Sequence, residues 1–270
     1  MASCDSYCIP SVFSYLNPVI IDDLTRFGNA NDGGYLLPAS ALKAIDWVIS
    51  FGVCNDWSFE KEIKDTFSNI QVIHAYDHTI GKESFLKSAF VGFAKFILGK
   101  GSWKEMTSDF KTFFDYQSFF REPCRHFKKR VYDRLDRDQD ITMEQIFSQV
   151  PKNARILLKI DIENDEYRIL PQVFAFRENI DVLVIEFHNT EPFREVFERH
   201  IKQLLSFYEV VHTHANNNAG IAPDGLPETL EITFLRKSLI TSEKGLRHTL
   251  PLRGLDAPND PSKPDLSLTF

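Results

Sequence analysis

Five polar residues that could do acid–base or metal chemistry stand at the ends of two apolar runs, residues 154–163 and 181–189. They are Asp161, Glu163, Glu186, His188 and Asn189. The unperturbed pKa of a histidine, about 6.5, leaves it largely neutral at pH 7, so His188 is our candidate for a general base that takes a proton from a hydroxyl. The alternative is a histidine that only makes structural hydrogen bonds.

The same residues could instead hold a divalent ion. His212 and His214 stand two residues apart and hence on one face of a strand, and Glu231 alternates with apolar residues further on. Carboxylate, imidazole and amide groups suit such an ion. The candidate ligands are Asp161, His188, His214 and Glu231. No compact ligand motif joins them, so we expect activity without a metal.

A glycine and an acid mark the ends of two earlier apolar runs. Residues 47–52 end in Gly52, which permits a tight turn and a close approach of a ligand to the backbone, and residues 70–77 end in Asp77. At the end of a parallel strand a carboxylate can accept hydrogen bonds from the two hydroxyls of a ribose. Together the two features predict a nucleoside site without deciding which nucleoside.

The loop after Gly52 narrows the choice. A dinucleotide site carries G-x-G-x-x-G, which lets a pyrophosphate rest on a helix N-terminus, whereas residues 52–58 contain one glycine and add Asn55 and Asp56. Asp56 would repel a pyrophosphate, but it suits a cationic ligand such as the sulfonium and ammonium of S-adenosylmethionine. A plain strand-to-helix turn capped by Asp56 is the alternative.

The period of the apolar residues alternates between strand-like and helix-like, which predicts an α/β domain with a mainly parallel sheet. The predicted strands are residues 47–52, 70–77, 154–163, 181–189, 208–217 and 229–237, with one more near 126–132. The predicted helices are residues 58–67, 142–150, 165–176 and 191–207. Ligands bind beyond the carboxyl ends of such strands, where the strand order reverses, and the polar residues above gather there.

Two segments are left without a role. Residues 80–120 are helical in pattern and rich in phenylalanine, and a lid, the face of a homodimer and core packing all stay open for them. Residues 257–270 are polar and rich in proline, so they are left unassigned, with disorder as one interpretation.

At this point the sequence resembles a known family. "LLKIDIENDEYRIL", residues 157–170, is similar to the K-I-D-[VI]-E-G-x-E signature of the FkbM-type S-adenosylmethionine-dependent methyltransferases. "DGGYLLP", "SFGVCNDWSFE" and "HAYDHT" are similar to a branch of the same superfamily, and the resemblance covers about residues 26–237. It departs at Asn164, where the family has glycine; asparagine is the next best residue for a left-handed conformation.

The resemblance implies a Rossmann-like class I methyltransferase fold, with a seven-stranded, mainly parallel sheet, an antiparallel last strand pair and helices on both faces. It implies S-adenosylmethionine as the cofactor, with Gly52, Asn55 and Asp56 against its methionine part, Asp77 on its ribose and Asp161 facing its methyl group. It also implies a turn over the same pocket, and a hairpin turn of purely structural use is the alternative. The residues of this turn are Asp32, Gly33, Gly34 and Tyr35.

We divide the chain accordingly. Residues 1–40 are an N-terminal segment that folds over the cofactor pocket, and residues 41–240 are a class I methyltransferase domain with a helical insertion at about 80–120. Residues 241–270 are a C-terminal tail.

The resemblance further implies O-methylation of a hydroxyl on a small molecule or glycan, such as a sugar or a surface polysaccharide. Amides hydrogen-bond well to sugar hydroxyls, although asparagines also favour plain turns. The candidate acceptor-binding residues are Glu163, Asn189, His214, Asn216 and Asn217. A nicotinamide-dependent oxidoreductase or epimerase of Rossmann type and a non-catalytic glycan-binding module are the alternatives.

Composition sets the outer limits. A net charge of −7 argues against broad nucleic-acid binding, and the basic stretch at residues 125–137 is either a solvated face or a cradle for an anionic acceptor. No apolar run reaches the roughly 18 residues that a spanning helix needs, and the first residues do not resemble a signal peptide. With four scattered cysteines in addition, we expect a cytoplasmic protein.

Overall fold

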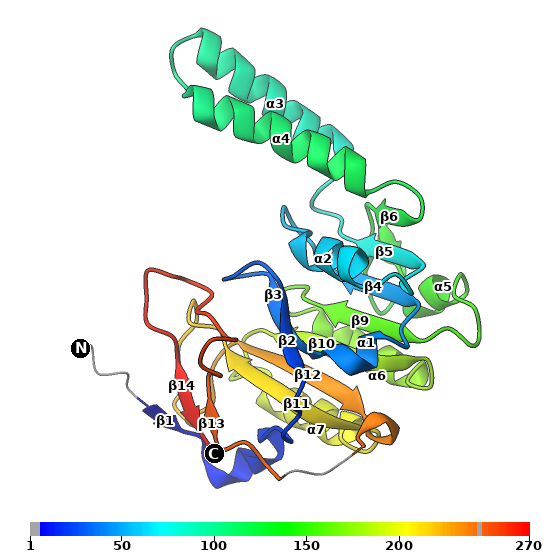
Figure 1. The fold of residues 1–270 in the computed structure, drawn as a ribbon, viewed down its shortest axis with the longest axis vertical. Coiled ribbons are helices and arrows are strands. Elements are labelled where there is room, and N and C mark those ends of the chain that lie inside the picture. Colours follow the sequence, from blue (N-terminus) through cyan, green and yellow to red (C-terminus); the bar gives the residue numbers. More distant parts are fainter. Residues whose placement is uncertain (1–5, 242–244) are drawn as a thin grey trace.

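A seven-stranded sheet forms the body of the protein in this computed structural model, which describes residues 6–241 and 245–270 (Figure 1). Its strands lie in the order β11-β12-β10-β9-β4-β5-β6. Their bounds are β4 Trp47–Phe51, β5 Val72–Tyr76, β6 Cys124–Phe127, β9 Ile156–Ile160, β10 Ile180–Phe187, β11 Tyr208–Ala215 and β12 Leu230–Arg236.

One strand of this sheet runs against the others. β12 pairs antiparallel with both of its neighbours, β10 and β11, whereas the other pairings are parallel. The prediction of a mainly parallel sheet with an antiparallel last pair is therefore confirmed. The strand expected near residues 126–132 is the edge strand β6, but it begins two residues earlier, at Cys124.

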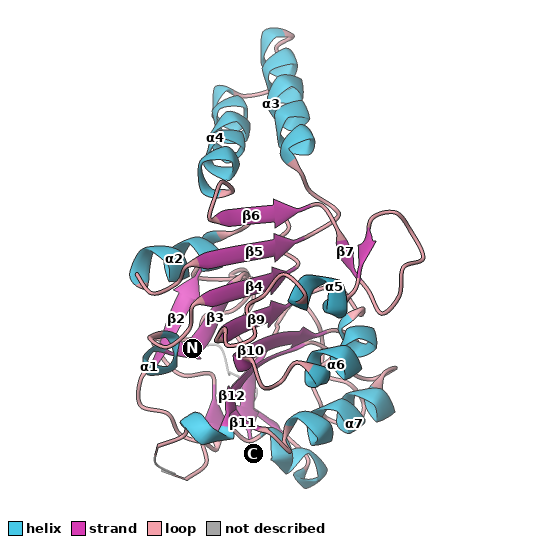
Figure 2. Cartoon of the chain, turned by 90° about the vertical axis from the view of Figure 1, so that its right-hand side faces the viewer, coloured by secondary structure: helices cyan, strands magenta, loops and turns pink. Residues whose placement is uncertain are grey.

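Helices cover both faces of the sheet, as predicted (Figure 2). One face carries α1 Ala39–Leu42 and α2 Ser58–Thr66, and the other carries α5 Met143–Phe147, α6 Glu166–Ala175 and α7 Arg194–Leu204. All residues of β4, β9 and β10 are buried, because a parallel strand with helices on both sides has no solvent face. Alternate side chains therefore enter two separate cores: Val48 packs with α2, and Ile49 packs in the core that contains α6 and α7.

The order in which the chain adds strands to the sheet reverses between the adjacent strands β4 and β9. From β4 the chain proceeds outward through β5 to β6, and it then returns to β9 on the other side of β4 and continues to β10. The carboxyl ends of β4 and β9 therefore diverge into loops that leave in opposite directions. This is the position at which open α/β sheets bind ligands.

Residues 80–120 form a helical hairpin that extends away from the body (Figures 1 and 2). It consists of α3 Lys82–Ile97 and α4 Trp103–Phe119, and α4 begins with a capping box between Ser102 and Glu105. At its base the ring of Trp57 packs edge-on against Phe85 and Tyr116. The helical pattern of this segment is thus confirmed.

The N-terminal part adds a hairpin of β2 Leu24–Gly28 and β3 Gly34–Pro38. A Cβ on Gly28, whose φ is +95°, would lie 2.4 Å from the carbonyl oxygen of Gly33, so this turn requires glycine. Thr233 Oγ1 donates a hydrogen bond to Leu36 O and so fastens β3 to β12. The other short elements are β1 Ser6–Cys8, η1 Ser11–Leu16, β7 Arg130–Val131, β8 Asp140–Ile141 and η2 Lys237–Leu239.

The interpretation of the C-terminal segment as disordered is wrong. Residues 267–269 form β14, which pairs with β1 and with β13 Thr249–Leu250 in a second, three-stranded sheet. Leu268 and Asn259 are buried. The segment is ordered because its few apolar side chains join the main core and its polar groups find partners on the body, which a count of polar and proline residues does not reveal.

Candidate ligand-binding site

A cavity of about 650 Å³ lies at the carboxyl ends of β4, β5, β9 and β10. This volume lies within the range of about 300–1,000 Å³ that is usual for small-molecule sites. Ten of the residues to which the sequence assigns a specific role line it: Asp32, Gly33, Gly52, Asn55, Asp56, Asp77, Asp161, Glu163, His188 and Asn216. Six others lie outside its wall: Gly34, Tyr35, Asn189, His214, Asn217 and Glu231.

Gly52 allows the loops after β4 and β9 to cross. Its φ is +74°, and a Cβ at this position would lie only 1.7 Å from the carbonyl oxygen of Asp161. Lys159 Nζ donates a hydrogen bond to Gly52 O at 2.6 Å and so fixes the turn at Gly52. Any side chain at position 52 would therefore separate the two strand ends that form the floor of the cavity.

Left-handed residues are concentrated at the same edge of the sheet. Cys54, Glu163, Asn164 and Asn189 all have positive φ, with 80° at Asn164. The left-handed conformation expected for Asn164 is confirmed, and Asn189 Nδ2 adds a hydrogen bond to Asn164 Oδ1 at 2.8 Å. Backbone strain of this kind persists where the surrounding structure enforces it, typically at functional sites.

Asp77 lines the cavity, but its carboxylate already has four donors. Oδ2 accepts hydrogen bonds from the N–H groups of Val53 at 3.1 Å and Cys54 at 2.8 Å. Oδ1 accepts from the N–H and the hydroxyl of Thr79, at 2.7 and 2.6 Å. Burial would raise the pKa of Asp77, but these bonds outweigh it and lower the pKa. Asp77 thus fixes the loop after β4, and ribose hydroxyls would have to share its oxygens.

Asp56 links the same loop to the N-terminal hairpin. Its Oδ1 accepts from Ser58 N at 2.9 Å, at the start of α2, and its Oδ2 accepts from Asn29 Nδ2 at 2.5 Å. A Cβ on Gly33 would lie 2.8 Å from Asp56 Oδ2, so the turn of residues 29–33 packs closely on this carboxylate. The turn between β2 and β3 is therefore a structural hairpin turn and also part of the cavity wall.

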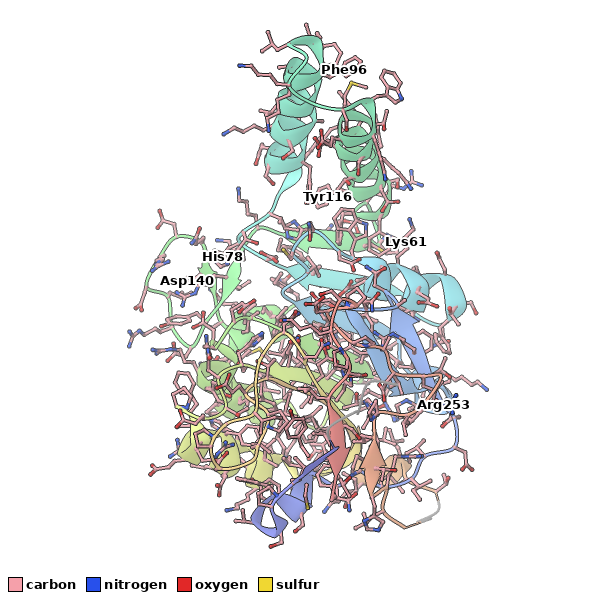
Figure 3. The ribbon with its side chains drawn as sticks, turned by 90° about the vertical axis from the view of Figure 1, so that its left-hand side faces the viewer. Lys61, His78, Phe96, Tyr116, Asp140 and Arg253 are labelled. Atoms are coloured by element: carbon pink, nitrogen blue, oxygen red, sulfur yellow. The ribbon has the colours of Figure 1, made fainter. Side chains whose placement is uncertain are left out.

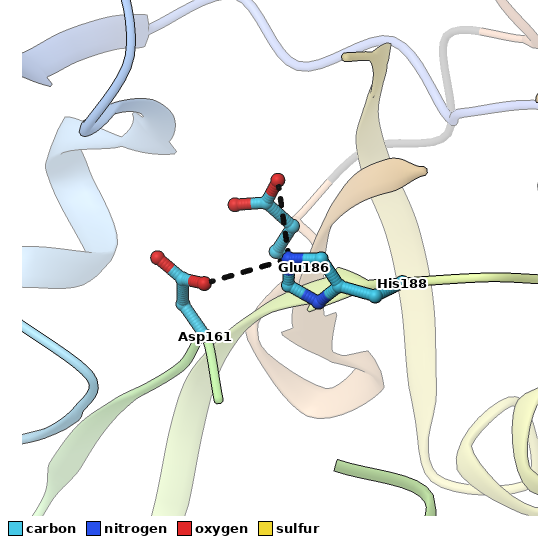
Figure 4. Close-up of side chains that lie close together, drawn as sticks. All are labelled: Asp161, Glu186 and His188. Atoms are coloured by element: carbon cyan, nitrogen blue, oxygen red, sulfur yellow. Dashed lines mark ion pairs between the residues drawn. The ribbon is translucent and has the colours of Figure 1, made fainter. Parts of the chain in front are cut away.

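Asp161, Glu186 and His188 lie together in the cavity (Figure 4). His188 Nε2 is 3.9 Å from Asp161 Oδ1 and 3.8 Å from Glu186 Oε1, and the three side chains offer ligand atoms within 4.8 Å of one another. They come from the ends of β9 and β10, as the sequence predicts. This set could hold one divalent ion.

His188 differs from the neutral base that the sequence suggested. Burial would lower its pKa, but contact with Glu166 and the charges of Glu186 and Asp161 outweigh burial and raise the pKa to about 9. The backbone N–H of His188 also donates to Glu166 Oε1 at 2.8 Å. The expectation of a largely neutral imidazole at pH 7 is therefore wrong, because three carboxylates that follow or flank the strand ends stabilise its charge.

Glu186 is a site residue to which the sequence assigned no role of its own. It is buried, it lines the cavity, and its Oε1 accepts a hydrogen bond from Asn216 Nδ2 at 2.8 Å. Burial and the neighbouring charges of Asp161 and Glu231 raise its pKa well above the usual value. Asn216, expected at the acceptor, is thus in the cavity wall and orients this carboxylate.

Lys159 is a second residue that the sequence did not single out. It is buried within β9, and its Nζ lies 3.6 Å from Asp161 Oδ2. Burial would lower its pKa, but the charges of Asp161, Glu60 and Glu186 raise it. The signal that could have identified it is a charge in the middle of an apolar run, because a buried cation needs partners.

His214, Glu231 and Asn217 belong to a polar network under the C-terminal segment. His214 Nδ1 lies 3.2 Å from Glu231 Oε2 and its Nε2 lies 3.1 Å from Asp265 Oδ1, and these partners outweigh burial and raise the pKa of His214 to about 10. Asn217 Nδ2 donates to Asp260 O at 3.0 Å. The structure thus does not bring His214 and Glu231 to the metal candidates Asp161 and His188; Glu186 takes that position.

The amide of Asn259 joins this network to the cavity. Asn259 Nδ2 donates to Glu231 Oε1 at 2.6 Å and lies 3.4 Å from Asp32 Oδ1. Burial raises the pKa of Asp32; the hydrogen bond from Asn259 opposes this, and the charges of Glu231 and Asp161 add to it. Tyr35, behind the same turn, donates to Asp161 Oδ2 at 3.3 Å.

Acidic groups outnumber basic ones around the cavity. Its lining includes seven carboxylates and three side chains of lysine or arginine. One of these cations, Arg130, is already paired with Asp165 at 2.7 Å and lies over the ring of Tyr132. The basic stretch therefore reaches the site only through Lys129 and Arg130, and the field in the cavity favours a cationic ligand.

Comparison with known proteins finds only remote likenesses. No protein-family model matches the chain, and no curated protein matches its sequence. Among solved structures, fibrillarin from Methanococcus jannaschii, a pre-rRNA processing protein, is 9% identical over 73% of this chain and 69% of its own, with a TM-score of 0.34. Precorrin-6y C5,15-methyltransferase from Geobacter metallireducens is 12% identical over 74% and 87%, with a TM-score of 0.37. TYW2 from M. jannaschii, solved with AdoMet, is 10% identical over 80% and 89%, with a TM-score of 0.30.

Proposed function

We propose that the protein is an S-adenosylmethionine-dependent O-methyltransferase that acts on a hydroxyl of a small molecule or glycan. The observation that carries the proposal is an acidic cavity at the point where the strand order reverses, in a sheet whose one antiparallel strand, β12, lies between β10 and β11. A sulfonium and an ammonium are attracted to such a cavity, whereas a pyrophosphate is repelled.

The residues of the cavity fit this cofactor in charge and shape. Gly52 lets the loops after β4 and β9 cross at the floor, and Asn55 and Asp56 add an amide and a carboxylate to the wall of the cavity. Asp77 organises the loop at the edge where the ribose is expected, and His78 and Thr79 also line that edge. When bound, the cofactor would supply an activated methyl group to a nucleophile in line with its sulfur.

The polar groups at the ends of β9 and β10 would accept the proton that the acceptor hydroxyl loses. His188 is cationic at neutral pH in this environment, so it cannot take a further proton, and we assign that role to Asp161, 3.9 Å away. Asp161 would accept the proton of the acceptor hydroxyl as the new bond forms. Positioning of the two reactants contributes the larger share of the rate.

A carbohydrate is the acceptor class that we favour. Asn218 and Thr229 line the cavity, and amide and hydroxyl groups match the donors and acceptors of a sugar, whereas the amide of Asn216 is engaged with Glu186 and the backbone of Asn218. Glu163, largely exposed at the rim, adds a carboxylate that can accept from a sugar hydroxyl. Asn217 and His214, earlier candidates for the same role, are engaged with the C-terminal segment instead.

Calorimetry and thermal denaturation test the cofactor directly. We expect S-adenosylmethionine and S-adenosylhomocysteine to raise the Tm in a concentration-dependent way, and NAD to leave it unchanged, because a ligand stabilises a fold only when it binds the native state. A shift with NAD alone would favour a nicotinamide-dependent oxidoreductase. No shift with any of the three would favour a glycan-binding module. A protein that binds S-adenosylmethionine is then assayed for transfer of a labelled methyl group to mono- and oligosaccharides.

A further inference from the structure

The hairpin of α3 and α4 carries exposed apolar side chains that the proposed reaction does not use. It stands away from the sheet, with Phe96 near its far end and Tyr116 near its base (Figure 3). Its most exposed apolar side chains are Phe90, Phe93, Ile97, Leu98, Trp103 and Phe114, which are between 44% and 68% exposed. So many exposed aromatic residues on one motif mark an interaction surface.

These side chains lie on one face of the hairpin. Ala89 of α3 and Phe113 of α4 are buried between the helices, and Phe90 and Phe114 each follow by one position. Gly92 faces Asp109 in the same way, and Phe93 follows it. Two antiparallel helices wind in opposite senses when both are viewed from the same end. The residue that follows an inward-facing residue therefore points to the same side of the helix pair in α3 and in α4. We call this side, with Phe90, Phe93, Ile97, Trp103 and Phe114, the apolar face.

The opposite side of the hairpin is polar. A groove there is lined by residues of both helices and their connection, among them Ser84, Ser88, Lys95, Glu105 and Asp109. Ser88 precedes the inward-facing Ala89 by one position, as expected for the other side of the helix pair. The two helices are therefore amphipathic as one unit, although neither has a strong apolar stripe on a single side by itself.

The charge of the hairpin differs in sign from that of the chain. Residues 82–119 contain six lysines and four acidic residues, a net charge of +2, in a chain whose net charge is −7. Lys104 follows Trp103 in the sequence at the far end, whereas Lys87, Lys95 and Lys100 line the polar groove. Tryptophan and phenylalanine flanked by lysine are typical of helices that lie in the boundary layer of a membrane.

We propose that the apolar face binds the surface of a membrane with anionic lipids. Trp103 and the phenylalanines would enter the boundary between head groups and acyl chains, and Lys104, next to Trp103, would contact the anionic head groups. A second copy of the chain would instead bring two positively charged hairpins together, which complementarity of charge disfavours. No helix in the described residues could cross a bilayer, so the contact is with the surface.

The position of the hairpin relates this contact to the cavity. α3 begins at Lys82, five residues after Asp77, and the connecting residues His78 and Thr79 line the cavity. A membrane bound by the apolar face would therefore lie on the side of the molecule toward which residues 78–81 lead from the cavity. Binding of lipid does not itself depend on the proposed methyl transfer, so the two can fail separately.

Vesicle binding by the full-length protein tests the proposal. We expect sedimentation with vesicles of phosphatidylcholine and phosphatidylglycerol at roughly 7:3, weaker sedimentation with phosphatidylcholine alone, and loss of the difference at about 0.5 M salt. The double variant I97E/W103E should bind at least about tenfold more weakly, because two carboxylates would have to enter the boundary layer. The variant V91E controls for the position of an added carboxylate, because Val91 is 43% exposed but lines the polar groove.

Fluorescence gives a second readout. Trp47 and Trp57 are buried, whereas Trp103 is 64% exposed, so a blue shift with anionic vesicles reports on Trp103. Circular dichroism confirms that the variants are folded. Equal binding by wild type and I97E/W103E, or an equal loss in V91E, would refute the proposal. So would absence of vesicle binding together with a dimer that I97E/W103E converts to a monomer in light scattering, which would identify the face as a contact between copies.

Discussion

The carboxylate of Asp77 accepts a hydrogen bond from the backbone N–H of Cys54 at 2.8 Å, across the ends of two adjacent parallel strands. Cys54 has a φ of 44°, so this bond holds a residue in a conformation that L-amino acids rarely adopt. The acid at the end of β5 is therefore part of the loop that follows β4. Cofactor binding and loop geometry depend on the same side chain.

Replacement of Asp77 tests both roles. Asp77→Ala leaves the N–H groups of Val53, Cys54 and Thr79 without their acceptor, and we expect a loss of about 1–3 kcal/mol in the free energy of unfolding. The Tm shift with S-adenosylmethionine should disappear. His78→Ala is the control, because His78 lines the same edge of the cavity. An undiminished Tm shift in D77A would remove Asp77 from the site.

The elevated pKa of His188 makes stability depend on pH. Because the folded-state pKa, about 9, exceeds the unfolded value of about 6.5, protonated His188 stabilises the fold fully below pH 6.5, and this contribution is lost as pH rises through 9. It amounts to at most about 3 kcal/mol. Urea unfolding at several pH values between 6 and 10 should show a smaller decline for H188Q than for wild type.

His214 has a raised pKa of the same sign and so adds to the decline of the wild type. The difference between wild type and H188Q isolates the contribution of His188, because His214 is present in both. Parallel curves for the two proteins would show that the carboxylates around His188 do not hold its proton.

Replacing Lys159 alone should lower the free energy of unfolding more than replacing Lys159 and Glu60 together. Lys159→Met leaves the buried Glu60 without the cation that opposes the rise of its pKa, and we expect a loss of about 3–5 kcal/mol. Glu60→Gln in the same chain removes that charge, so the double variant should recover part of the loss. Chemical denaturation of the four proteins measures the coupling. Additive losses would mean that the two side chains do not interact.

Substitutions at Asn164 separate the effect of backbone strain on stability from that of the side chain. Because its φ is 80°, Asn164→Gly should keep or slightly raise the stability, whereas Asn164→Ala should lose about 1 kcal/mol or more. Both variants lose the hydrogen bond from Asn189, so the difference between them measures the conformational cost. Equal Tm values for the two would contradict a left-handed residue at this position.

Chelation tests the metal. At pH 7 the protonated His188 is no ligand until it loses its proton, so we expect methyl transfer to persist with EDTA. D161N should nevertheless lower kcat, as expected for the residue that accepts the proton of the acceptor hydroxyl. Loss of turnover with EDTA that one divalent ion restores would instead assign Asp161, Glu186 and His188 as its ligands.

The framework of the molecule was predictable because it depends on local pattern. Mainly apolar runs such as residues 156–160 and 180–187 predict strands buried on both faces, and the rule for the carboxyl edge then brings Gly52, Asp161 and His188 to one cavity. The resemblance also implied the antiparallel last strand pair, which the structure contains.

The electrostatics and the packing of the chain ends were not predictable in this way. The charge of His188 depends on Glu166, which reaches it from a helix, and the role of His214 depends on Asp265, 51 residues later. Neither pairing has a sequence signature. The order of the C-terminal segment has the same origin, since Asn217 and Glu231 select their partners only once the sheet has formed.

The amide of Asn259 has one further consequence. Because it bridges Glu231 and Asp32, transient detachment of the C-terminal segment also releases part of the cavity wall. A ligand that needs Asp32 in place must therefore slow this local opening, so backbone amides near Asn259 would exchange with deuterium more slowly and a protease would cut there less readily. Hydrogen exchange and proteolysis near Asn259 would then report whether the cavity is occupied, although the ligand does not contact that segment.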